Sequence, residues 1–312
     1  MRIVIVYGSD QAQRWRDALA AQLRDAQVDI WQPGFTEPAD FAVGWAPPAR
    51  FFVDQPRLRA FLPTGAGVEA ILKNPNLPPD LPIVRVEDAG MGEQMVAYCR
   101  FEVLRWMQRR DEYAAQQAAG VWRQLPESSR EDWPIGVFGL GVLGREVANA
   151  FAADGFPVNA FSRSNTRSES TVRLFTEAHG ADQFETFMRA TRVLIILAPL
   201  TAATQDKFDR KTLQLLPQGA CVINVARGGL IVDEALLELL DSGHLHGAAL
   251  DVFRQEPLPA QHRYWTHPKV RMTPHTAAVT PMGPAAKQIA QKIRALAANQ
   301  PVSGVVDRSR GY

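Results

Sequence analysis

The chain has 312 residues, of which 46% are hydrophobic and 21% are charged, and its formal net charge is +1. This length suggests two domains, and the composition is typical of globular proteins and excludes a disordered chain. The near-balance of 34 basic and 33 acidic residues gives no general attraction to nucleic acid or to anionic membranes. Two cysteines make no disulfide framework, and the apolar runs are too short for a signal peptide or a membrane helix. We therefore expect a cytoplasmic protein with neither nucleic-acid nor membrane partners.

The first third of the chain predicts strands that alternate with helices. Short apolar runs predict strands at 3–6, 41–44, 59–62 and 83–86. Asp10 and the apolar spacing that follows it predict a helix over 11–26. Segment 93–117 contains no glycine or proline, so we expect one long helix over about 91–117 that connects two domains.

A second series of strands and helices begins near Trp133. Its strands are expected at 135–139, 157–161, 193–198, 220–225, 248–252 and 269–272. Helices are expected at 142–153, at 232–241 and, near the end of the chain, at 284–298. Strands that alternate with helices predict a parallel sheet with right-handed crossovers. Near-continuous apolar runs such as VLIIL are typical of strands covered on both faces.

A glycine-rich turn, Gly139-Leu140-Gly141-Val142-Leu143-Gly144, follows the strand at 135–139 and precedes a helix. Gly139 permits the tight turn, Gly141 lets the backbone approach a pyrophosphate, and Gly144 lets the helix pack on the strand. The free N–H groups of the helix N-terminus favour an anion there. The alternative is an ordinary tight turn, but the strand and helix around it favour dinucleotide binding.

The strand at 157–161 is expected to end at the adenosine ribose, where NAD-binding sites usually carry an acidic residue. This chain has Ser162 and Arg163 there, with Arg167 close behind. Hydroxyl and guanidinium groups bind a 2′-phosphate that a carboxylate would repel. We therefore predict NADP (NADPH) as cofactor, with NAD as the weaker alternative. The other interpretation is that both arginines are solvated loop charges.

Three polar residues follow the ends of later strands. Arg227 follows the strand at 220–225, Glu256 the strand at 248–252 and His275 the strand at 269–272. Each alone has an ordinary interpretation as a surface charge or a loop residue. Because ligands bind beyond the carboxyl ends of strands in open parallel sheets, we expect the three side chains to converge near the cofactor.

The segments around these residues resemble the signature of D-isomer-specific 2-hydroxyacid dehydrogenases. The similarity is carried by Ala226-Arg227-Gly228-Gly229, Val232-Asp233-Glu234, 247–253, Glu256-Pro257-Leu258-Pro259 and Thr273-Pro274-His275. Further segments resemble the glyoxylate/hydroxypyruvate reductase A branch, namely Trp45-Ala46-Pro47-Pro48, 65–69, 88–94 and 306–312.

The resemblance implies an α/β chain of two doubly wound parallel-sheet domains. A Rossmann cofactor domain at 101–281 is expected to be inserted into a flavodoxin-like substrate domain at 1–100 and 282–312. It further implies an NADP-dependent enzyme that reduces small 2-keto acids, glyoxylate to glycolate and hydroxypyruvate to D-glycerate. Trp122, Arg123 and Trp133 suggest that the 118–134 region exposes apolar surface. In the family that this chain resembles, the region packs against a second subunit, so the resemblance implies a homodimer.

The resemblance also assigns roles to individual residues. Arg227 would hold the substrate carboxylate, His275 would donate a proton to the keto oxygen, and Glu256 would orient the imidazole and stabilise its protonated form. Backbone N–H groups around Ala66 and Gly67 would bind the substrate carboxylate, and Trp45 would wall the pocket unless it belongs to the core. The remaining expected cofactor contacts are Met91, Val142, Leu143, Ala198, Pro199, Val225, Ala226 and Asp251. Asp251 has the alternative interpretation of a helix or loop cap.

Two other functions stay open at this point. The chain is alternatively a dehydrogenase of another D-2-hydroxy acid, or a non-catalytic dinucleotide-sensing protein similar to the corepressors of this fold. No metal site is expected. A pocket walled by Trp45 argues against bulky substrates.

Overall fold

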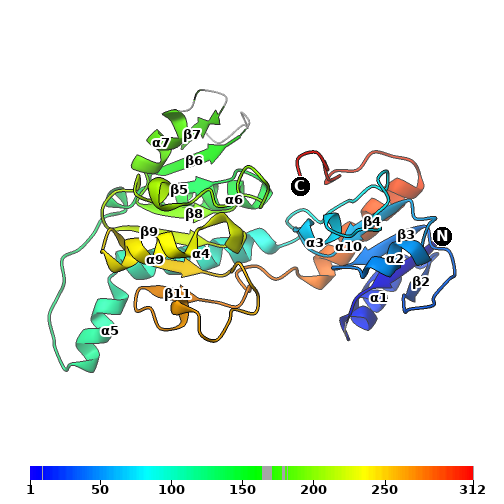
Figure 1. The fold of residues 1–312 in the computed structure, drawn as a ribbon, viewed down its shortest axis with the longest axis horizontal. Coiled ribbons are helices and arrows are strands. Elements are labelled where there is room, and N and C mark those ends of the chain that lie inside the picture. The colour runs from blue at the N-terminus through cyan, green and yellow to red at the C-terminus, as the bar shows by residue number, and fades with distance from the viewer. Residues whose placement is uncertain (9, 164–170, 178–179, 181, 312) are drawn as a thin grey trace. The chain divides into compact units, whose positions relative to one another are not determined.

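A computed structural model describes the chain except residues 9, 164–170, 178–179, 181 and 312. The chain divides into two compact units, drawn in Figure 1. Unit 1 consists of Met1–Met91 and Thr280–Tyr312, and unit 2 consists of Gly92–Val279. The sequence predicted domain boundaries after residues 100 and 281, whereas the two units divide after residues 91 and 279.

Unit 1 is built on a four-stranded parallel sheet with the order β2-β1-β3-β4. Its elements are β1 (Arg2–Val6), α1 (Gln11–Gln22), β2 (Gln27–Ile30), β3 (Phe41–Gly44), α2 (Ala49–Asp54), β4 (Ala60–Pro63), α3 (Glu69–Leu72) and α10 (Met282–Ala297). This is the flavodoxin-like order, in which the second strand in sequence lies at the edge beside the first.

Helices cover both faces of this sheet (Figure 1). Val4, Ala42 and Phe61 pack in one apolar cluster with Phe51 of α2 and Ile71 of α3. Alternate strand residues point to the opposite face, where α1 contacts both β1 and α10. Buried apolar side chains therefore pack on both faces of the sheet and stabilise it. The loops with Trp45 and residues 65–67 follow the carboxyl ends of β3 and β4.

The strand predicted at 83–86 is reduced to isolated bridges. Ile83 pairs in parallel with Phe61, and Val84 pairs antiparallel with Val305. The segment thus occupies the fifth position of the flavodoxin-like order, beside β4. Pro82 lacks a backbone donor, and the next residue but one already pairs with the C-terminal segment, so no continuous ladder forms.

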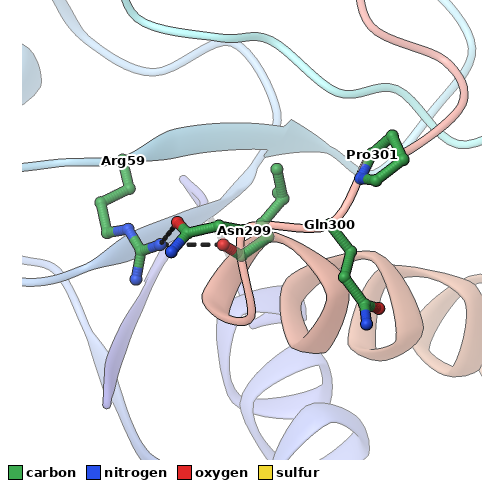
Figure 2. Close-up of a pocket in the computed structure, with 5 residues that line it drawn as sticks. Arg59, Asn299, Gln300 and Pro301 are labelled. Carbon is green, nitrogen blue, oxygen red and sulfur yellow. Dashed lines mark hydrogen bonds between the residues drawn. The ribbon is translucent and has the colours of Figure 1, made fainter.

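Arg59 attaches the end of α10 to the sheet, as Figure 2 shows. Its Nη2 donates to the Leu296 carbonyl at 2.8 Å and to Asn299 Oδ1 at 3.0 Å, and its guanidinium lies 5.3 Å from the Phe41 ring centroid. A cation at the last turn of a helix satisfies terminal carbonyls and complements the helix dipole. The shallow pocket at this point is lined by Arg59, Leu296, Asn299, Gln300 and Pro301, none of which is a predicted site residue.

Unit 2 is built on a seven-stranded parallel sheet with the order β11-β10-β9-β8-β5-β6-β7. Its strands are β5 (Ile135–Phe138), β6 (Val158–Ser162), β7 (Val172–Thr176), β8 (Val193–Ile196), β9 (Ala220–Asn224), β10 (Leu245–Leu250) and β11 (Val270–Met272). Its helices are α4 (Met91–Met107), whose first residue belongs to unit 1, α5 (Arg110–Ala118), η1 (Arg130–Asp132), α6 (Val142–Ala153), α7 (Asp182–Arg189), α8 (Arg210–Leu213), η3 (Gly228–Leu230), α9 (Asp233–Asp241) and η4 (Arg263–Trp265). Counted from β5, this is the Rossmann order with a seventh strand added beyond the sixth.

Two apolar clusters lie on opposite faces of this sheet. One contains Phe138, Leu194 and Val222 together with side chains of α7, α8 and α9. The other contains Val137 and Ile195 together with side chains of α4 and α6. The predicted fold class, two doubly wound parallel-sheet α/β domains, is confirmed, because neighbouring strand residues face different helical layers in each unit.

The single helix predicted over 91–117 is broken. It consists of α4 and α5, and Arg109 between them has a left-handed backbone with φ 55° and ψ 36°. After the break, Asp111 turns back to accept from Arg105 Nε at 2.7 Å and from Arg271. Because Arg271 belongs to β11, far along the chain, the sequence pattern of the helix alone did not reveal the break.

The prediction also missed β2 and β7, which are edge strands of their sheets. Edge strands keep polar, partly exposed residues, so their apolar signal is weak. In the described part of the chain, no helix has the length and apolar character needed to cross a bilayer.

Candidate active site

The glycine-rich turn joins β5 to α6 with the geometry that the motif predicts. Gly139 has φ +106°, and a Cβ there would lie 2.7 Å from the Ala198 nitrogen. A Cβ on Gly144 would overlap the Gly139 carbonyl oxygen, whereas a Cβ on Gly141, the residue before α6, would meet nothing within 4 Å. Two glycines therefore permit close packing, and the third borders open space beside the helix N-terminus. This arrangement fits the pyrophosphate of a dinucleotide.

The end of β6 carries the residues expected to select the cofactor. Ser162 is the last residue of β6 and pairs with Thr176 of β7, and Arg163 follows it with an exposed side chain. The strand end next to the glycine turn thus carries a hydroxyl and a guanidinium, as predicted. Arg167 lies outside the described residues.

A buried asparagine shapes the loop that carries Arg227. The Asn224 side chain donates from Nδ2 to the Arg227 carbonyl at 2.9 Å and accepts from the Ala226 nitrogen at 3.1 Å. Arg227 in turn donates from Nη1 to the Ala226 carbonyl at 2.6 Å. A Cβ on Gly228 would overlap the Phe253 backbone, so the loops after β9 and β10 lie backbone against backbone. These contacts hold Arg227 beside the loop that leads to Glu256.

His275 and Glu256 form a direct pair. Nδ1 of His275 lies 2.7 Å from Oε2 of Glu256. The other carboxylate oxygen, Oε1, accepts from the Phe253 nitrogen at 2.9 Å, so the carboxylate is itself held in place. Because Nδ1 is used by Glu256, Nε2 is the imidazole nitrogen that can face a substrate. The imidazole is 47% exposed, which leaves it accessible.

Asp251 organises the segment that carries His275. Its carboxylate is buried and accepts from the Thr273 hydroxyl at 2.6 Å, from the Thr276 nitrogen at 2.7 Å and from the Ala277 nitrogen at 2.9 Å. Its carbonyl accepts from the His275 nitrogen at 2.8 Å. These bonds correspond to the loop-cap interpretation of Asp251. Its assignment as a cofactor contact stays a prediction.

The other expected cofactor contacts in unit 2 lie near these strand ends. Ala198 is buried against Gly139, and the Pro199 carbonyl accepts from the Thr204 hydroxyl at 2.7 Å. Val225 and Ala226 are buried between β9 and Arg227, and Val142 and Leu143 form the start of α6. Their contacts with a cofactor stay predictions.

The expected substrate contacts Trp45, Ala66 and Gly67 belong to unit 1. Trp45 follows β3, and its ring lies 2.8 Å from the position of a Cβ on Gly65, in the loop after β4. The structure therefore brings Trp45 and the 65–67 loop together at the carboxyl ends of β3 and β4. Met91, also in unit 1, is buried and accepts from the Thr280 hydroxyl through Sδ at 3.4 Å. The roles of these residues stay predictions.

Sequence reasoning missed three residues that shape the site. Asn224 gave a usable signal, because it is a polar residue at the end of an otherwise apolar strand. Thr273 and Tyr98 gave none, since their hydroxyl groups meet only through tertiary packing, 2.9 Å apart.

Unit 2 has the Rossmann strand order, a glycine-rich turn, and Arg, Glu and His beyond three adjacent strand ends. This combination is typical of the class of dinucleotide-binding dehydrogenases. The family model "D-isomer specific 2-hydroxyacid dehydrogenase, NAD binding domain" matches residues 101–277, which lie within unit 2. The chain belongs to the D-isomer specific 2-hydroxyacid dehydrogenase family, in its glyoxylate/hydroxypyruvate reductase A branch.

Similar proteins cover the whole chain. Glyoxylate/hydroxypyruvate reductase A of Salmonella typhi is 43% identical over 317 aligned residues, with 100% of both chains covered. A dehydrogenase of this family from Xanthobacter autotrophicus, solved in complex with NADPH and MES, matches with a TM-score of 0.93 and 34% identity, covering 100% of this chain and 99% of that one. The NADPH-dependent glyoxylate/hydroxypyruvate reductase of Sinorhizobium meliloti was solved with NADP and sulfate. It matches with a TM-score of 0.92 and 31% identity, covering 100% of this chain and 99% of that one.

Proposed function

We propose that this chain reduces glyoxylate to glycolate and hydroxypyruvate to D-glycerate with NADPH as cofactor. The observation that carries the proposal is the His275–Glu256 pair, whose atoms lie 2.7 Å apart, beside the loop of Arg227 in a dinucleotide-binding unit. The named activities of the similar proteins from Salmonella typhi and Sinorhizobium meliloti support it.

Each residue of the site has a task in this reaction. Arg227 binds the substrate carboxylate through its planar donor fork and polarises the keto oxygen. His275 donates the proton from Nε2 to that oxygen, while Glu256 orients the ring from Nδ1 and stabilises the imidazolium. NADPH, when bound, supplies the hydride. The backbone at Gly141 and the N-terminus of α6 would hold its pyrophosphate, while Gly139 and Gly144 keep the turn closely packed.

The test is kcat/KM for glyoxylate and for hydroxypyruvate, each measured with NADPH and with NADH. We expect turnover of both acids and a clear preference for NADPH. Turnover with another D-2-hydroxy acid alone would assign the chain a different substrate. Tight NADPH binding without turnover of any 2-keto acid would indicate a dinucleotide-sensing protein and contradict the proposal.

The preference for NADPH is expected to depend on Arg163. Arg163→Ala removes a charge-assisted contact with the 2′-phosphate, so kcat/KM with NADPH should fall by about 10-fold or more while the NADH value stays the same. Arg189→Ala is the matched control, because Arg189 pairs with Glu185 on the exposed side of α7. Equal losses with both cofactors would contradict the 2′-phosphate assignment.

We further propose that the chain forms a homodimer through α5 and the segment after it. No residue of α5 is buried, and the Trp122 side chain is 102% exposed. The expected exposure is wrong for Trp133, which is buried in the apolar cluster with α4 and α6. Large exposed aromatic side chains are typical of interface centres. Apolar burial between two copies would compensate for this exposure.

Mass measurement in solution tests the dimer. The wild-type protein should have twice the chain mass of 34.5 kDa. Trp122→Glu should weaken the dimer by about 100-fold, because a charge replaces a buried aromatic anchor. Trp265→Glu is the control, since Trp265 is also exposed in unit 2 but lies outside this segment. A monomeric wild-type protein would contradict the proposal.

A further inference from the structure

A chain of hydroxyl groups connects α4 to the segment that carries His275. The Tyr98 hydroxyl lies 2.9 Å from Thr273 Oγ1, and Thr273 Oγ1 lies 2.6 Å from Asp251 Oδ1. A carboxylate only accepts, so the single proton of Thr273 is donated to Asp251. Tyr98 must therefore donate to Thr273, and the direction of the chain is defined from Tyr98 to Thr273 to Asp251.

The far end of this chain determines the conformation of His275. Asp251 binds Thr273, Thr276 and Ala277 through its carboxylate and His275 through its carbonyl. His275 has a left-handed backbone with φ 57°, which non-glycine residues adopt only when surrounding contacts impose it. The hydrogen bonds between Asp251 and residues 273–277 hold the backbone of His275 in this conformation. A shift of Thr273 would therefore change the backbone from which the imidazole projects.

The near end of the chain is firmly placed. Tyr98, Glu102 and Trp106 are spaced four residues apart and so share one face of α4. Glu102 accepts from Arg271 Nε at 3.0 Å, and the Trp106 Nε1 atom lies 3.0 Å from the position of a Cβ on Gly247. This face of α4 therefore lies along β11 and β10. Burial also raises the pKa of the Tyr98 hydroxyl, which keeps it a neutral donor.

We propose that Tyr98 is a positioning residue for His275 and acts through Thr273 and Asp251. The proposal rests on the proposed function, in which His275 is the proton donor. Proton transfer depends on the orientation of the imidazole, whereas the glycine turn and the end of β6 lie at other strand ends, and Asp251 keeps its bonds to the Thr276 and Ala277 nitrogens. Loss of the Tyr98 hydroxyl should therefore lower kcat and leave NADPH affinity unchanged.

The test uses the full-length chain with single substitutions that remove one hydroxyl. Tyr98→Phe removes the Tyr98–Thr273 bond, Thr273→Val removes both hydrogen bonds of the chain, and the double variant removes both hydroxyl groups. Thr273→Ser keeps the hydroxyl and is the conservative variant. Thr191→Val is the matched control, because Thr191 is fully buried and donates to the Phe187 carbonyl at 2.8 Å, before the amino end of β8. Thermal unfolding of every variant records the structural cost.

We expect kcat for glyoxylate to fall about 5-fold in Tyr98→Phe, the usual effect of one lost neutral hydrogen bond. Thr273→Val should lose about 10- to 50-fold, because it also removes one of the three donors to the Asp251 carboxylate, leaving the Thr276 and Ala277 nitrogens. The double variant should be within about 2-fold of Thr273→Val, since residues in one network are not additive. Thr273→Ser and Thr191→Val should retain the wild-type kcat, and the dissociation constant for NADPH should stay constant throughout. Unchanged kcat in Tyr98→Phe would overturn the proposal, whatever the effect of Thr273→Val.

A second readout separates this proposal from the proposed function. The imidazole of His275 is observed by nitrogen-15 NMR in the presence of NADPH, which requires no turnover. The resonance of its Nδ1, which faces Glu256, should shift or broaden in Tyr98→Phe and Thr273→Val but not in Thr191→Val. If the wild-type chain turns over no 2-keto acid, the proposed function fails, and this NMR comparison still decides whether Tyr98 positions His275. Identical spectra in all variants would overturn the proposal.

Discussion

Replacing His275 with alanine is expected to lower kcat for glyoxylate and hydroxypyruvate by about 10²- to 10⁴-fold, the usual contribution of general acid catalysis. The physical reason is that alanine has no group to replace the proposed proton donor, the imidazole whose Nδ1 lies 2.7 Å from Glu256 Oε2. NADPH binding should persist, because the glycine turn and the end of β6 are unchanged. Steady-state rates and NADPH titration measure the two effects separately.

His246→Ala is the matched control for this substitution. His246 lies near the amino end of β10, whereas His275 follows the carboxyl end of β11. Because cofactor and substrate bind beyond carboxyl ends, His246→Ala should retain the wild-type kcat. Retention of most of the activity in His275→Ala would refute its role as the proton donor.

Replacing Arg227 with alanine is expected to lower kcat/KM for both acids by about 10²- to 10⁴-fold, because two charge-assisted hydrogen bonds to the substrate carboxylate are lost. Arg227→Lys should recover only part of this loss, since an ammonium group keeps the charge but not the planar donor fork. Both variants should fold, because Asn224 holds the loop through the carbonyl of residue 227 and the nitrogen of Ala226.

The measurement is kcat and KM for glyoxylate in the alanine and lysine variants. Arg210→Ala serves as control, because Arg210 pairs with Glu238 at the surface at 3.3 Å. A lysine variant as active as the wild type would show that charge alone suffices and would contradict two-point binding. An alanine variant with wild-type kcat and KM would show that Arg227 does not bind the substrate.

The glycine-rich turn and the strand-end residues were predictable because their requirements are local. Gly139 needs a positive φ, and a strand followed by a helix defines the place of Gly141 and Gly144. The same logic placed Arg227, Glu256 and His275 beyond the ends of the neighbouring strands β9, β10 and β11, since parallel strands present their carboxyl ends at one edge. Their assigned functions stay predictions.

The misplaced elements share a different cause. The ladders of β2 and β7 lie at sheet edges, where exposed residues obscure the apolar pattern. The break at Arg109 is accompanied by the ion pair between Asp111 and Arg271, which are distant in the chain. Local propensity carried no information about such a partner, because the stretch 93–117 has no glycine or proline at which the helix would be expected to stop.

The sequence by itself determined the fold class, the family and the residue types of the candidate site. Periodicity, glycine positions and polar residues at strand ends all depend on residues that are close together in the chain, so they can be recognised without the folded structure. Only the tertiary structure decided that Asp251 caps the 273–277 segment and that Tyr98 reaches Thr273. The first bond joins β10 to the segment after β11, and the second joins α4 to that segment. Their geometry depends on how β10, β11 and α4 pack together, and that packing is a property of the folded chain as a whole.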